Sequence, residues 1–275
     1  MNVAQALAQA ASLGLDRLDA QLLLLHALGR SGTDRGWLLA HDTDGIAGAH
    51  EHAFAAACQR RAGGEPLAYI VGRKEFHGLD LQVDARVLVP RPDTETLVDW
   101  AIELLRAHEA PRVVDLGTGS GAIALALKKE IPGARVEACD TSADALAAAQ
   151  ANAHRLGLAV EFRLASWLDG AVGFYDLIAS NPPYVAVGDA HLAALQHEPQ
   201  PALVSGADGL DAIRAIVAQA PSHLGAGGWL LLEHGWDQAP AVRALLHAAG
   251  FGYVASRRDL AGIERCTGAK WLELG

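Results

Sequence analysis

The stretch VVDLGTGSGAIALAL, residues Val113–Leu127, predicts a buried strand, a glycine-rich turn and a helix in direct succession. Gly117, Gly119 and Gly121 lie in the turn. Glycine lets the backbone approach a ligand closely, and the first turn of a helix adds unpaired N–H groups and the positive end of the helix dipole. The turn is therefore a candidate ligand site on an α/β fold.

The alternation of strands and helices continues throughout the chain beyond about Asp93. Helical segments separate short apolar runs, namely RVVDLG, ARVEACD, AVEFRLA, FYDLIAS and GWLLLEHG. Such alternation predicts a mostly parallel sheet with helices on both faces. Two further β-like runs, GYVASRRDL and KWLELG, are expected to follow a last helix near residues 239–249.

The earlier part of the chain has a different pattern. Up to about Arg61, alanine and leucine recur at helical spacing, which predicts a small helical bundle. Short β-type runs then alternate around Gly78 and predict a hairpin. We therefore expect three parts: a helical bundle over residues 1–68, a β-hairpin linker over residues 69–92, and an α/β domain over residues 93–275.

Length and composition restrict the class of protein. At 275 residues the chain is long enough to bury a core without disulfides, and its three cysteines are widely spaced. Neither they nor the histidines have metal-ligand spacing, no leader peptide is recognisable, and no apolar stretch reaches the ~18 residues of a membrane span. We expect a soluble, cytoplasmic protein without a metal. The formal net charge of -10 favours a protein or small-molecule substrate over nucleic acid.

The acid that precedes the first glycine, Asp115, narrows the choice of ligand. The order G-x-G-x-G differs from the G-x-G-x-x-G turn that binds the pyrophosphate of dinucleotides, and a pyrophosphate disfavours a nearby carboxylate. A carboxylate suits the ammonium and sulfonium groups of S-adenosylmethionine. Asp140, at the end of the next strand, can accept both ribose hydroxyls, or alternatively cap the following helix. Trp167, after the third strand, can pack on the adenine ring.

The run FYDLIAS is followed by Asn181, Pro182, Pro183 and Tyr184. Proline ends a strand because it lacks an N–H, so turn formation alone could account for the pair. Asn181 also offers a side-chain carbonyl and Pro182 a backbone carbonyl, and two acceptors suit the two hydrogens of an NH2 group. Held in this way, an amide or aromatic amine nitrogen exposes its lone pair to a methyl donor, while Tyr184 stacks on the flat group that carries it.

The combination of D-x-G-x-G-x-G with N-P-P-Y resembles that of S-adenosylmethionine-dependent amino methyltransferases. Further segments narrow this resemblance to the peptide chain release factor glutamine methyltransferases, the PrmC/HemK family, over essentially the whole chain. These segments are LDAQLLL near the N-terminus, GEPLAYIVGRKEFHGLDLQVDARVLVPRPDTETLVDWAIE, HEPQPALVSGADGLDAIRAI and LLLEHGWDQ. The resemblance implies a class I methyltransferase fold, which is Rossmann-like with a mostly parallel seven-stranded sheet. A small helical domain that recognises the substrate protein and a β-hairpin linker would precede it.

The resemblance also implies the substrate and the roles of the site residues. The acceptor would be the glutamine of the Gly-Gly-Gln motif in class 1 release factors, and S-adenosyl-L-homocysteine would be the second product. Ser166 stands where relatives often carry an acid, so a contact from that position to the adenine amino group would come from a hydroxyl or the backbone. The residues expected to bind the cofactor are Gly117, Thr118, Gly119, Ser120, Gly121, Asp140, Trp167 and Asn181. Those expected to bind the substrate are Arg91, at the entrance, with Asn181, Pro182, Pro183 and Tyr184, and Asn181, Pro182 and Tyr184 are expected to be catalytic.

Three other functions agree less well with the sequence. An adenine methyltransferase acting on DNA or RNA would use the same tetrapeptide, but also a basic, aromatic-lined duplex site. A noncatalytic S-adenosylmethionine-binding partner protein would have no need of Asn181 and Tyr184, and a nicotinamide dehydrogenase would have the other glycine spacing. We expect a protein-glutamine N-methyltransferase that supports translation termination, acts as a monomer and binds neither nucleic acid nor membrane.

Overall fold

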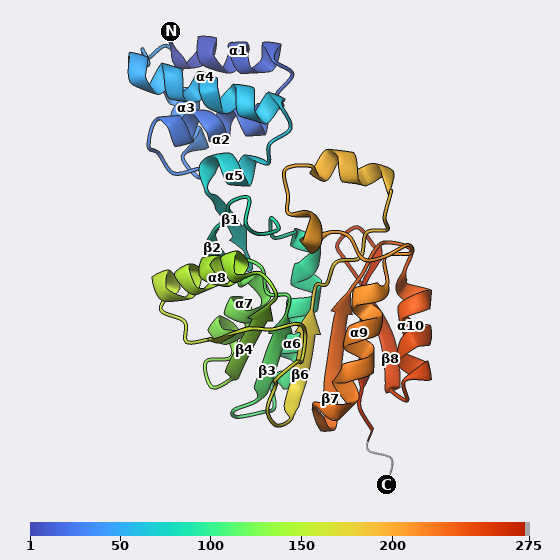
Figure 1. Ribbon diagram of the computed structural model, residues 1–275. Helices are drawn as coiled ribbons and strands as arrows, with labels where there is room; N and C mark the ends of the chain where they lie inside the picture. Colours follow the sequence, from blue (N-terminus) through green and yellow to red (C-terminus); the bar gives the residue numbers. More distant parts are fainter. Residues whose placement is uncertain (273–275) are drawn as a thin grey trace. The chain divides into compact units, whose positions relative to one another are not determined.

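The computed structural model describes residues 1–272. The chain divides into two compact units, Met1–Arg73 and Lys74–Gly275, which are described separately below (Figure 1). The three-part division expected from the sequence, with boundaries after residues 68 and 92, stays a prediction. In the described part of the chain, every helix is too short or too polar to cross a membrane.

The N-terminal unit is a group of helices around one apolar core. Asn2 and Gln5 form a reciprocal capping box at the start of the first helix, and Asp16 caps the second by accepting from two backbone N–H groups. Leu23, Leu24 and Phe54 lie in the core of this unit. Its helices are α1 Val3–Ser12, α2 Arg17–Ala27, α3 Arg35–Ala40, α4 Gly48–Ala62 and α5 Leu67–Val71.

A short hairpin, β1 Arg73–Phe76 and β2 Leu79–Gln82, follows the N-terminal helices. His77 and Gly78 connect its strands with φ values of 48° and 70°, the positive values that a tight two-residue hairpin turn requires. The hairpin that the sequence predicts around Gly78 is confirmed.

The second unit is built on a seven-stranded sheet with the order β5-β4-β3-β6-β7-β9-β8. All neighbouring strands are parallel up to β7, whereas β9 is antiparallel to both β7 and β8. The mostly parallel seven-stranded sheet predicted for this part of the chain is confirmed. Its strands are β3 Arg112–Leu116, β4 Arg135–Asp140, β5 Glu161–Leu164, β6 Tyr175–Ser180, β7 Leu224–Glu233, β8 Gly252–Arg258 and β9 Glu264–Lys270.

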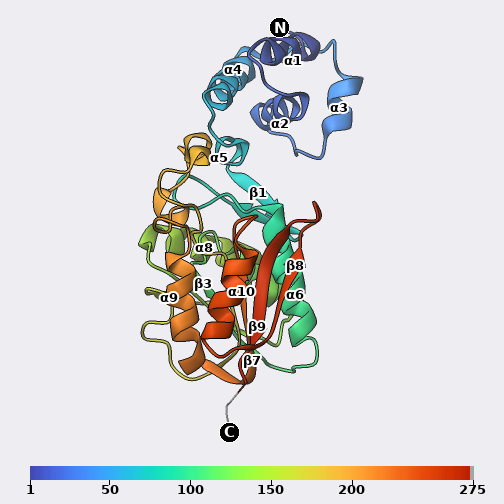
Figure 2. The same cartoon turned by 90° about the vertical axis from the view of Figure 1, so that its right-hand side faces the viewer.

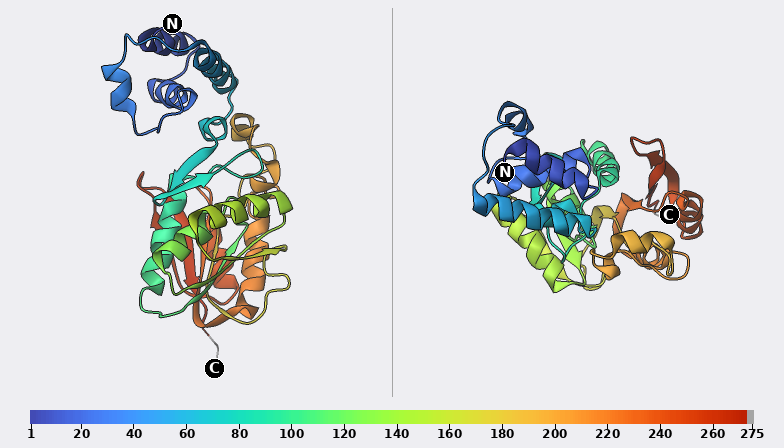
Figure 3. Two further views of the ribbon diagram at one scale, coloured as in Figure 1. Left: turned by 90° about the vertical axis from the view of Figure 1, so that its left-hand side faces the viewer. Right: turned by 90° about the horizontal axis from the view of Figure 1, so that it is seen from above.

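Helices cover both faces of this sheet. Figure 2 shows α9 and α10 on one side of the strands and α6 on the other, and Figure 3 (left) shows α8 in front of the sheet when it is viewed from the left-hand side of Figure 1. Ile213 of α9 and Val242 of α10 pack with Ile178 of β6 in one buried core. The helices of this unit are α6 Glu95–Leu105, α7 Ala122–Glu130, α8 Ala143–Leu156, α9 Asp211–Gln219 and α10 Ala239–Ala248, with short 3-10 turns η1 Pro92–Thr94, η2 Ala190–Leu195, η3 Gln200–Ala202 and η4 Ala220–Ser222.

The position expected for the last strand, KWLELG, is wrong. The strand β9 spans Glu264–Lys270, and the final residues 273–275 of the expected run lie outside the described residues. The reason is the close packing of β9, where a Cβ atom on Gly268 would lie 2.4 Å from Leu231 Cδ2 and 2.6 Å from the Trp100 ring. Because this strand must carry small residues where its neighbours approach, it lacks the large apolar residues that mark the other strands.

Candidate active site

Two motifs meet where the connections of the sheet change direction, between β3 and β6. Leu116, the last residue of β3, pairs with Ser180, the last residue of β6. The Ser180 hydroxyl donates to the Leu116 carbonyl at 2.7 Å. The glycine loop follows the first of these strands and Asn181 follows the second, so the fold brings both to the same strand ends. Ligands of open parallel sheets bind at this edge, in the crevice at such a switch point.

The glycine loop has a backbone that only glycine adopts without strain. Gly117, Gly119 and Gly121 have φ values of 71°, 55° and 85°. The Gly117 N–H donates to the Cys139 carbonyl at 2.9 Å, which fixes the loop against the end of β4. A Cβ atom on Gly119 would meet no atom within 4 Å. The loop therefore leaves open space at its centre, beside the start of α7.

Asp115 lies buried beneath the loop. Its Oδ2 accepts from the Thr118 hydroxyl at 2.6 Å and from the Ala124 N–H at 3.2 Å. Among residues 1–272, Asp115 Oδ1 has no hydrogen-bond partner. Burial raises the pKa of this carboxyl to about 7. A cation bound at the loop would provide a positive charge beside the buried carboxylate, and would therefore favour its ionised form.

Asp140, at the end of β4, links the glycine loop to the next helix. Its Oδ2 accepts from the Gly119 N–H at 3.0 Å and its Oδ1 from the Ser142 N–H at 2.9 Å. The cap of α8 is Ser142, whose hydroxyl accepts from the Ala145 N–H. A carboxylate has about four acceptor sites, so Asp140 retains the capacity to accept two hydroxyl groups. Its role at a ribose stays a prediction.

Trp167 lies next to the glycine loop in a strained backbone conformation. Its φ is 51°, in the left-handed region that non-glycine residues rarely adopt. The ring lies so that a Cβ atom on Gly117 would be 3.6 Å from Trp167 Cζ3. The Cys139 thiol donates to the Trp167 carbonyl at 3.0 Å and holds this turn against β4. Strain of this kind often occurs at ligand sites, where the surrounding structure maintains it.

The remaining residues predicted at the cofactor lie around the same loop. Thr118 and Ser120 are buried, and the Thr118 hydroxyl is already paired with Asp115, so contacts from this loop to a ligand would come mainly from its backbone. Ser166 is exposed beside Trp167. The open glycine loop, the unpaired buried carboxyl oxygen of Asp115 and the half-exposed Asp140 fit a ligand with cationic groups and a ribose.

Asn181 and Pro182 present two free acceptors at the end of β6. The Asn181 Nδ2 group donates to Thr94 Oγ1 at 3.1 Å, which directs the side-chain oxygen away from Thr94. Within the described residues 1–272, no donor is paired with Asn181 Oδ1 or with the Pro182 carbonyl. Two free acceptors on consecutive residues match in number the two hydrogens of an NH2 group.

Tyr184 is fixed at both its hydroxyl and its backbone. The hydroxyl donates to Glu233 Oε1 at 3.4 Å, and the backbone carbonyl accepts from Gln238 Nε2 at 3.1 Å. Burial is the main cause that raises the pKa of Tyr184, and the nearby charge of Glu233 adds to it, so the phenol stays protonated. The ring therefore offers a neutral, flat surface next to Asn181.

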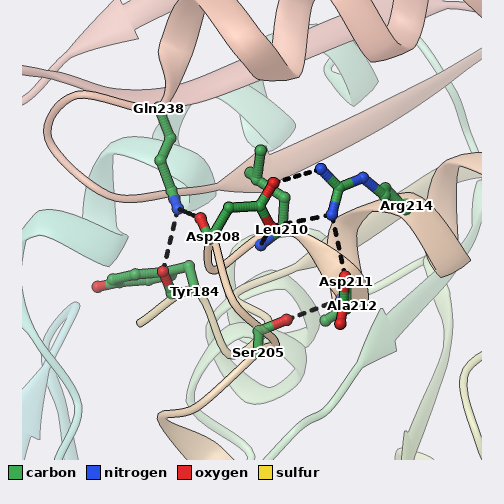
Figure 4. Close-up of polar contacts among 8 residues, drawn as sticks. All are labelled: Tyr184, Ser205, Asp208, Leu210, Asp211, Ala212, Arg214 and Gln238. Carbon is green, nitrogen blue, oxygen red and sulfur yellow. Dashed lines mark hydrogen bonds and ion pairs between the residues drawn. The ribbon is translucent and has the colours of Figure 1, made fainter. Parts of the chain in front are cut away.

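The Gln238 amide joins the tetrapeptide to the loop before α9 (Figure 4). Its Nε2 donates to the carbonyl of Tyr184 and, at 3.2 Å, to that of Asp208. The Asp208 carboxylate pairs with Arg214, which also pairs with Asp211 at 2.9 Å. These contacts hold the 205–211 loop against Tyr184, so the segments HEPQPALVSGADGLDAIRAI and LLLEHGWDQ both contribute to holding the N-P-P-Y tetrapeptide.

Gly209 provides a test of this arrangement. Its φ is 76°, and a Cβ atom there would lie 2.2 Å from the Tyr184 carbonyl oxygen and 2.7 Å from Gln238 Nε2. We expect Gly209→Ala to displace Tyr184 and to reduce activity at least tenfold, with a lower melting temperature. The added Cβ atom would clash with the backbone carbonyl of Tyr184, and alanine is strained at this positive φ. Activity assays and thermal unfolding measure both effects. Gly188→Ala, also at positive φ but with no atom within 4 Å of the added Cβ, is the matched control. Equal activity of the two variants would contradict the prediction.

A pocket of about 360 Å³ opens beside Asn181 and Tyr184. Its other walls are mostly apolar and come from Leu88, Leu195 and Leu203, among others. Arg91 also lines this pocket. Its role at the entrance for the substrate stays a prediction.

The Arg91 guanidinium is held by an ion pair with the buried carboxylate of Glu198. Glu198 Oε2 also accepts from the Val89 N–H at 3.1 Å. These contacts tie the segment after the hairpin to the loop that follows the tetrapeptide.

Sequence reasoning missed four side chains that support this site. Thr94, Glu198, Glu233 and Gln238 contact the predicted residues, but none was assigned a role. Each lies in a segment that carries the family resemblance, and that was the available signal. In the described part of the chain, no cluster of His, Cys, Asp or Glu has the arrangement of a metal site.

Comparisons with known proteins agree with this geometry. Residues 95–198 match the methyltransferase small domain, and residues 2–72 match the PrmC N-terminal domain. The chain is 52% identical to a release factor glutamine methyltransferase from Bordetella pertussis over 259 residues, which cover 93% of this chain and 95% of that protein. It is 51% identical to another from Xylella fastidiosa over 267 residues, which cover 95% and 96%. A methyltransferase crystal structure from Pyrococcus furiosus matches with a TM-score of 0.55 over 79% of this chain and 99% of that one; at 18% identity this shows the fold alone.

Proposed function

Because the chain belongs to the release factor glutamine methyltransferase family, we propose that it methylates the side-chain amide nitrogen of the glutamine in the Gly-Gly-Gln motif of class 1 peptide chain release factors. It is an S-adenosylmethionine-dependent protein-glutamine N-methyltransferase. The cofactor supplies an electrophilic methyl group and leaves as S-adenosyl-L-homocysteine. Methylation of this motif would support translation termination.

The observation that carries this proposal is the pair of free acceptors on Asn181 and Pro182, next to the glycine loop. An amide nitrogen is a poor nucleophile because its lone pair is delocalised into the carbonyl group. Acceptors on both of its hydrogens orient the nitrogen and favour its pyramidal form, in which the lone pair is available. The rigid backbone of Pro182 and Pro183 keeps the acceptors in place. Tyr184 would stack on the flat amide.

The residues around the glycine loop have a separate task, which is to bind and orient the methyl donor. Asp115 would favour its cationic groups, Asp140 would accept from the ribose hydroxyls, and Trp167 would pack on the adenine. The excess proton of the methylated nitrogen can leave to water after transfer, so no strong general base is required. Catalysis would therefore come from positioning and electrostatics, as the free acceptors suggest.

The N-terminal helical unit would recognise the body of the release factor, as the match of residues 2–72 to the PrmC N-terminal domain supports. We further propose that the enzyme acts as a cytoplasmic monomer and requires no nucleic acid. Gel filtration with light scattering, with and without a release factor, tests the oligomeric state.

The direct test compares two classes of acceptor. Purified protein is incubated with methyl-labelled S-adenosylmethionine and either a bacterial class 1 release factor or adenine-containing DNA. We expect label only in the release factor, at one glutamine that mass spectrometry assigns to Gly-Gly-Gln. A release factor with Gly-Gly-Glu in that position is the matched control and should stay unlabelled. Label in DNA but not in the release factor would overturn the assignment.

A further inference from the structure

We propose that His234 is a positioning residue for the reaction, because its buried ring fixes the turn that carries Gln238, and Gln238 holds Tyr184. The inference rests on the proposed function, in which the acceptor amide stacks on the Tyr184 ring. His234 directly follows β7 and Gln238 directly precedes α10, so the turn lies where the chain passes from the sheet into the helix.

The Gln238 side chain uses both ends of its amide. Its Oε1 accepts from the Gly235 N–H at 2.8 Å. That contact turns the NH2 end toward the backbone carbonyls of Tyr184 and Asp208, to which Nε2 donates (Figure 4). The position of the Gln238 amide, and with it that of the Tyr184 backbone, therefore depends on where Gly235 lies.

Gly235 is held at its carbonyl by two hydrogen bonds. This carbonyl accepts from the Gln238 N–H at 3.1 Å and lies 2.9 Å from His234 Nδ1. Glycine has the most permissive backbone of all residues, so contacts of this kind are needed to keep it in one conformation. Because a carbonyl can only accept, His234 Nδ1 must carry a proton.

The other ring nitrogen of His234 contacts Thr267 on β9. Both side chains are 0% exposed, and His234 Nε2 lies 2.7 Å from Thr267 Oγ1. Burial is the largest effect on the ring and lowers the pKa of His234, so the ring is neutral at pH 7. With its one proton on Nδ1, the neutral ring can only accept at Nε2, and the Thr267 hydroxyl donates to it.

Two further side chains set the direction of this hydrogen bond. Arg243 on α10 can only donate, and its Nη1 lies 2.7 Å from Ser256 Oγ on β8. Ser256 Oγ in turn lies 2.8 Å from Thr267 Oγ1. Because Ser256 accepts from the guanidinium, its own hydrogen is available to Thr267, and the hydrogen of Thr267 to His234. The hydrogen bonds therefore run in one direction, from α10 through β8 and β9 to the end of β7.

This series of contacts begins and ends at the same helix. Arg243 lies within α10, and Gln238 lies immediately before its first residue. The series therefore fixes the start of α10 against three strands, at the point from which Gln238 reaches Tyr184. A displacement of about 1 Å far from the reacting atoms can lower a rate about 10²-fold, so these contacts are expected to act on kcat.

Two substitutions of His234 test which of its contacts matters. Asparagine has its amide nitrogen on Cγ, as Nδ1 is, so His234→Asn can still donate to the Gly235 carbonyl. Glutamine is one carbon longer, so the amide of His234→Gln lies near the position of Nε2 and contacts Thr267 instead. With saturating S-adenosylmethionine and a release factor substrate, we expect kcat to fall about 10- to 100-fold in His234→Gln and less than about tenfold in His234→Asn. A role in packing alone predicts the reverse order, since glutamine is closer to histidine in volume.

Substitutions of Thr267 test the same contacts with the histidine in place. Thr267→Val keeps the shape of the side chain and removes the hydroxyl, whereas Thr267→Ser keeps the hydroxyl and loses a buried methyl group. Both should lower the melting temperature. We expect kcat to be about five- to tenfold lower in Thr267→Val and within about twofold of the wild type in Thr267→Ser. The affinity for S-adenosylmethionine, measured by calorimetry, should be unchanged in both, because Asp140 and the glycine loop keep their contact.

The protonation of the His234 ring can be measured without any substrate. In protein with ¹⁵N-labelled histidine, the nitrogen chemical shifts distinguish a protonated ring nitrogen from an unprotonated one. The chain has twelve histidines, and the signals that disappear in His234→Asn or His234→Gln are those of this ring. We expect Nδ1 to be protonated and Nε2 to be unprotonated at neutral pH. A proton on Nε2 would overturn the inference.

The possible outcomes distinguish this inference from the proposed function. A wild-type protein that leaves the release factor unlabelled contradicts the proposed function, and the inference falls with it. If the release factor is labelled, the inference alone is contradicted when His234→Gln is as active as His234→Asn or more so. It is also contradicted when Thr267→Val has the same kcat as Thr267→Ser, and this second pair decides if the His234 variants do not fold.

Discussion

Replacing Asn181 with alanine is expected to lower kcat for methylation of the release factor by about 10²- to 10³-fold, the range seen when one group that stabilises a transition state is removed. The variant loses one of two acceptors that hold the amide hydrogens, and the Pro182 carbonyl alone cannot fix the orientation of the nitrogen. The affinity for S-adenosylmethionine should change only a few-fold, since Asp115, Asp140 and the glycine loop remain. Single-turnover assays and calorimetry measure the two quantities.

Asn181→Asp sharpens this test. It retains an acceptor oxygen, but loses the NH2 group that donates to Thr94 Oγ1 at 3.1 Å. A carboxylate at this position can only accept, so the hydrogen bond with the Thr94 hydroxyl would have to reverse its direction. We expect this variant to be at least tenfold less active than the wild type, with unchanged folding by circular dichroism. If Asn181→Ala kept wild-type kcat, the two-acceptor arrangement would be irrelevant to the reaction.

The fold could be predicted from the sequence largely because its strands are buried on both faces. Runs such as VVDL and DLIA carry continuous apolar residues that alternate with amphipathic helices, and these patterns follow from burial alone. The strand β9 lacked this signal. Gly268 is required there by the approach of Trp100 and Leu231, and such a contact between distant elements leaves no periodic pattern in the local sequence.

The site shows the same division between local and distant signals. The glycine loop and the tetrapeptide could be read from the sequence because each is a short segment whose own chemistry points to a ligand. Thr94 and Glu233 could not, because their importance arises only in the folded chain. Thr94 is 87 positions from Asn181, and Glu233 is 49 positions from Tyr184. A threonine next to two acids, or a glutamate at the end of an apolar strand, suggests only a helix start or a strand end.

Replacing Asp140 with alanine should weaken cofactor binding and leave kcat largely intact, whereas Asn181→Ala should do the reverse. We expect the Kd for S-adenosylmethionine to rise about 100-fold, because a carboxylate that accepts from ribose hydroxyls makes charge-assisted hydrogen bonds. The variant also loses the bond from the Gly119 N–H to Asp140 Oδ2, which holds the centre of the glycine loop. At saturating cofactor, kcat should recover to within about tenfold of the wild type, since Asn181 and Pro182 are intact.

The matched control is Asp144→Ala, which removes an exposed carboxylate from the first turn of the same helix, α8. If Asp140 served only the structure at the start of this helix, both variants would lower the melting temperature and leave the Kd nearly equal. If Asp140 binds the ribose, only Asp140→Ala raises the Kd. Measured together with Asn181→Ala, the result also tests whether the two sides of the crevice have separate roles. Asp140, at the end of β4, should control cofactor affinity, and Asn181, after β6, should control kcat. A variant pair in which both changes altered kcat alone would mean that the methyl donor does not bind at the end of β4.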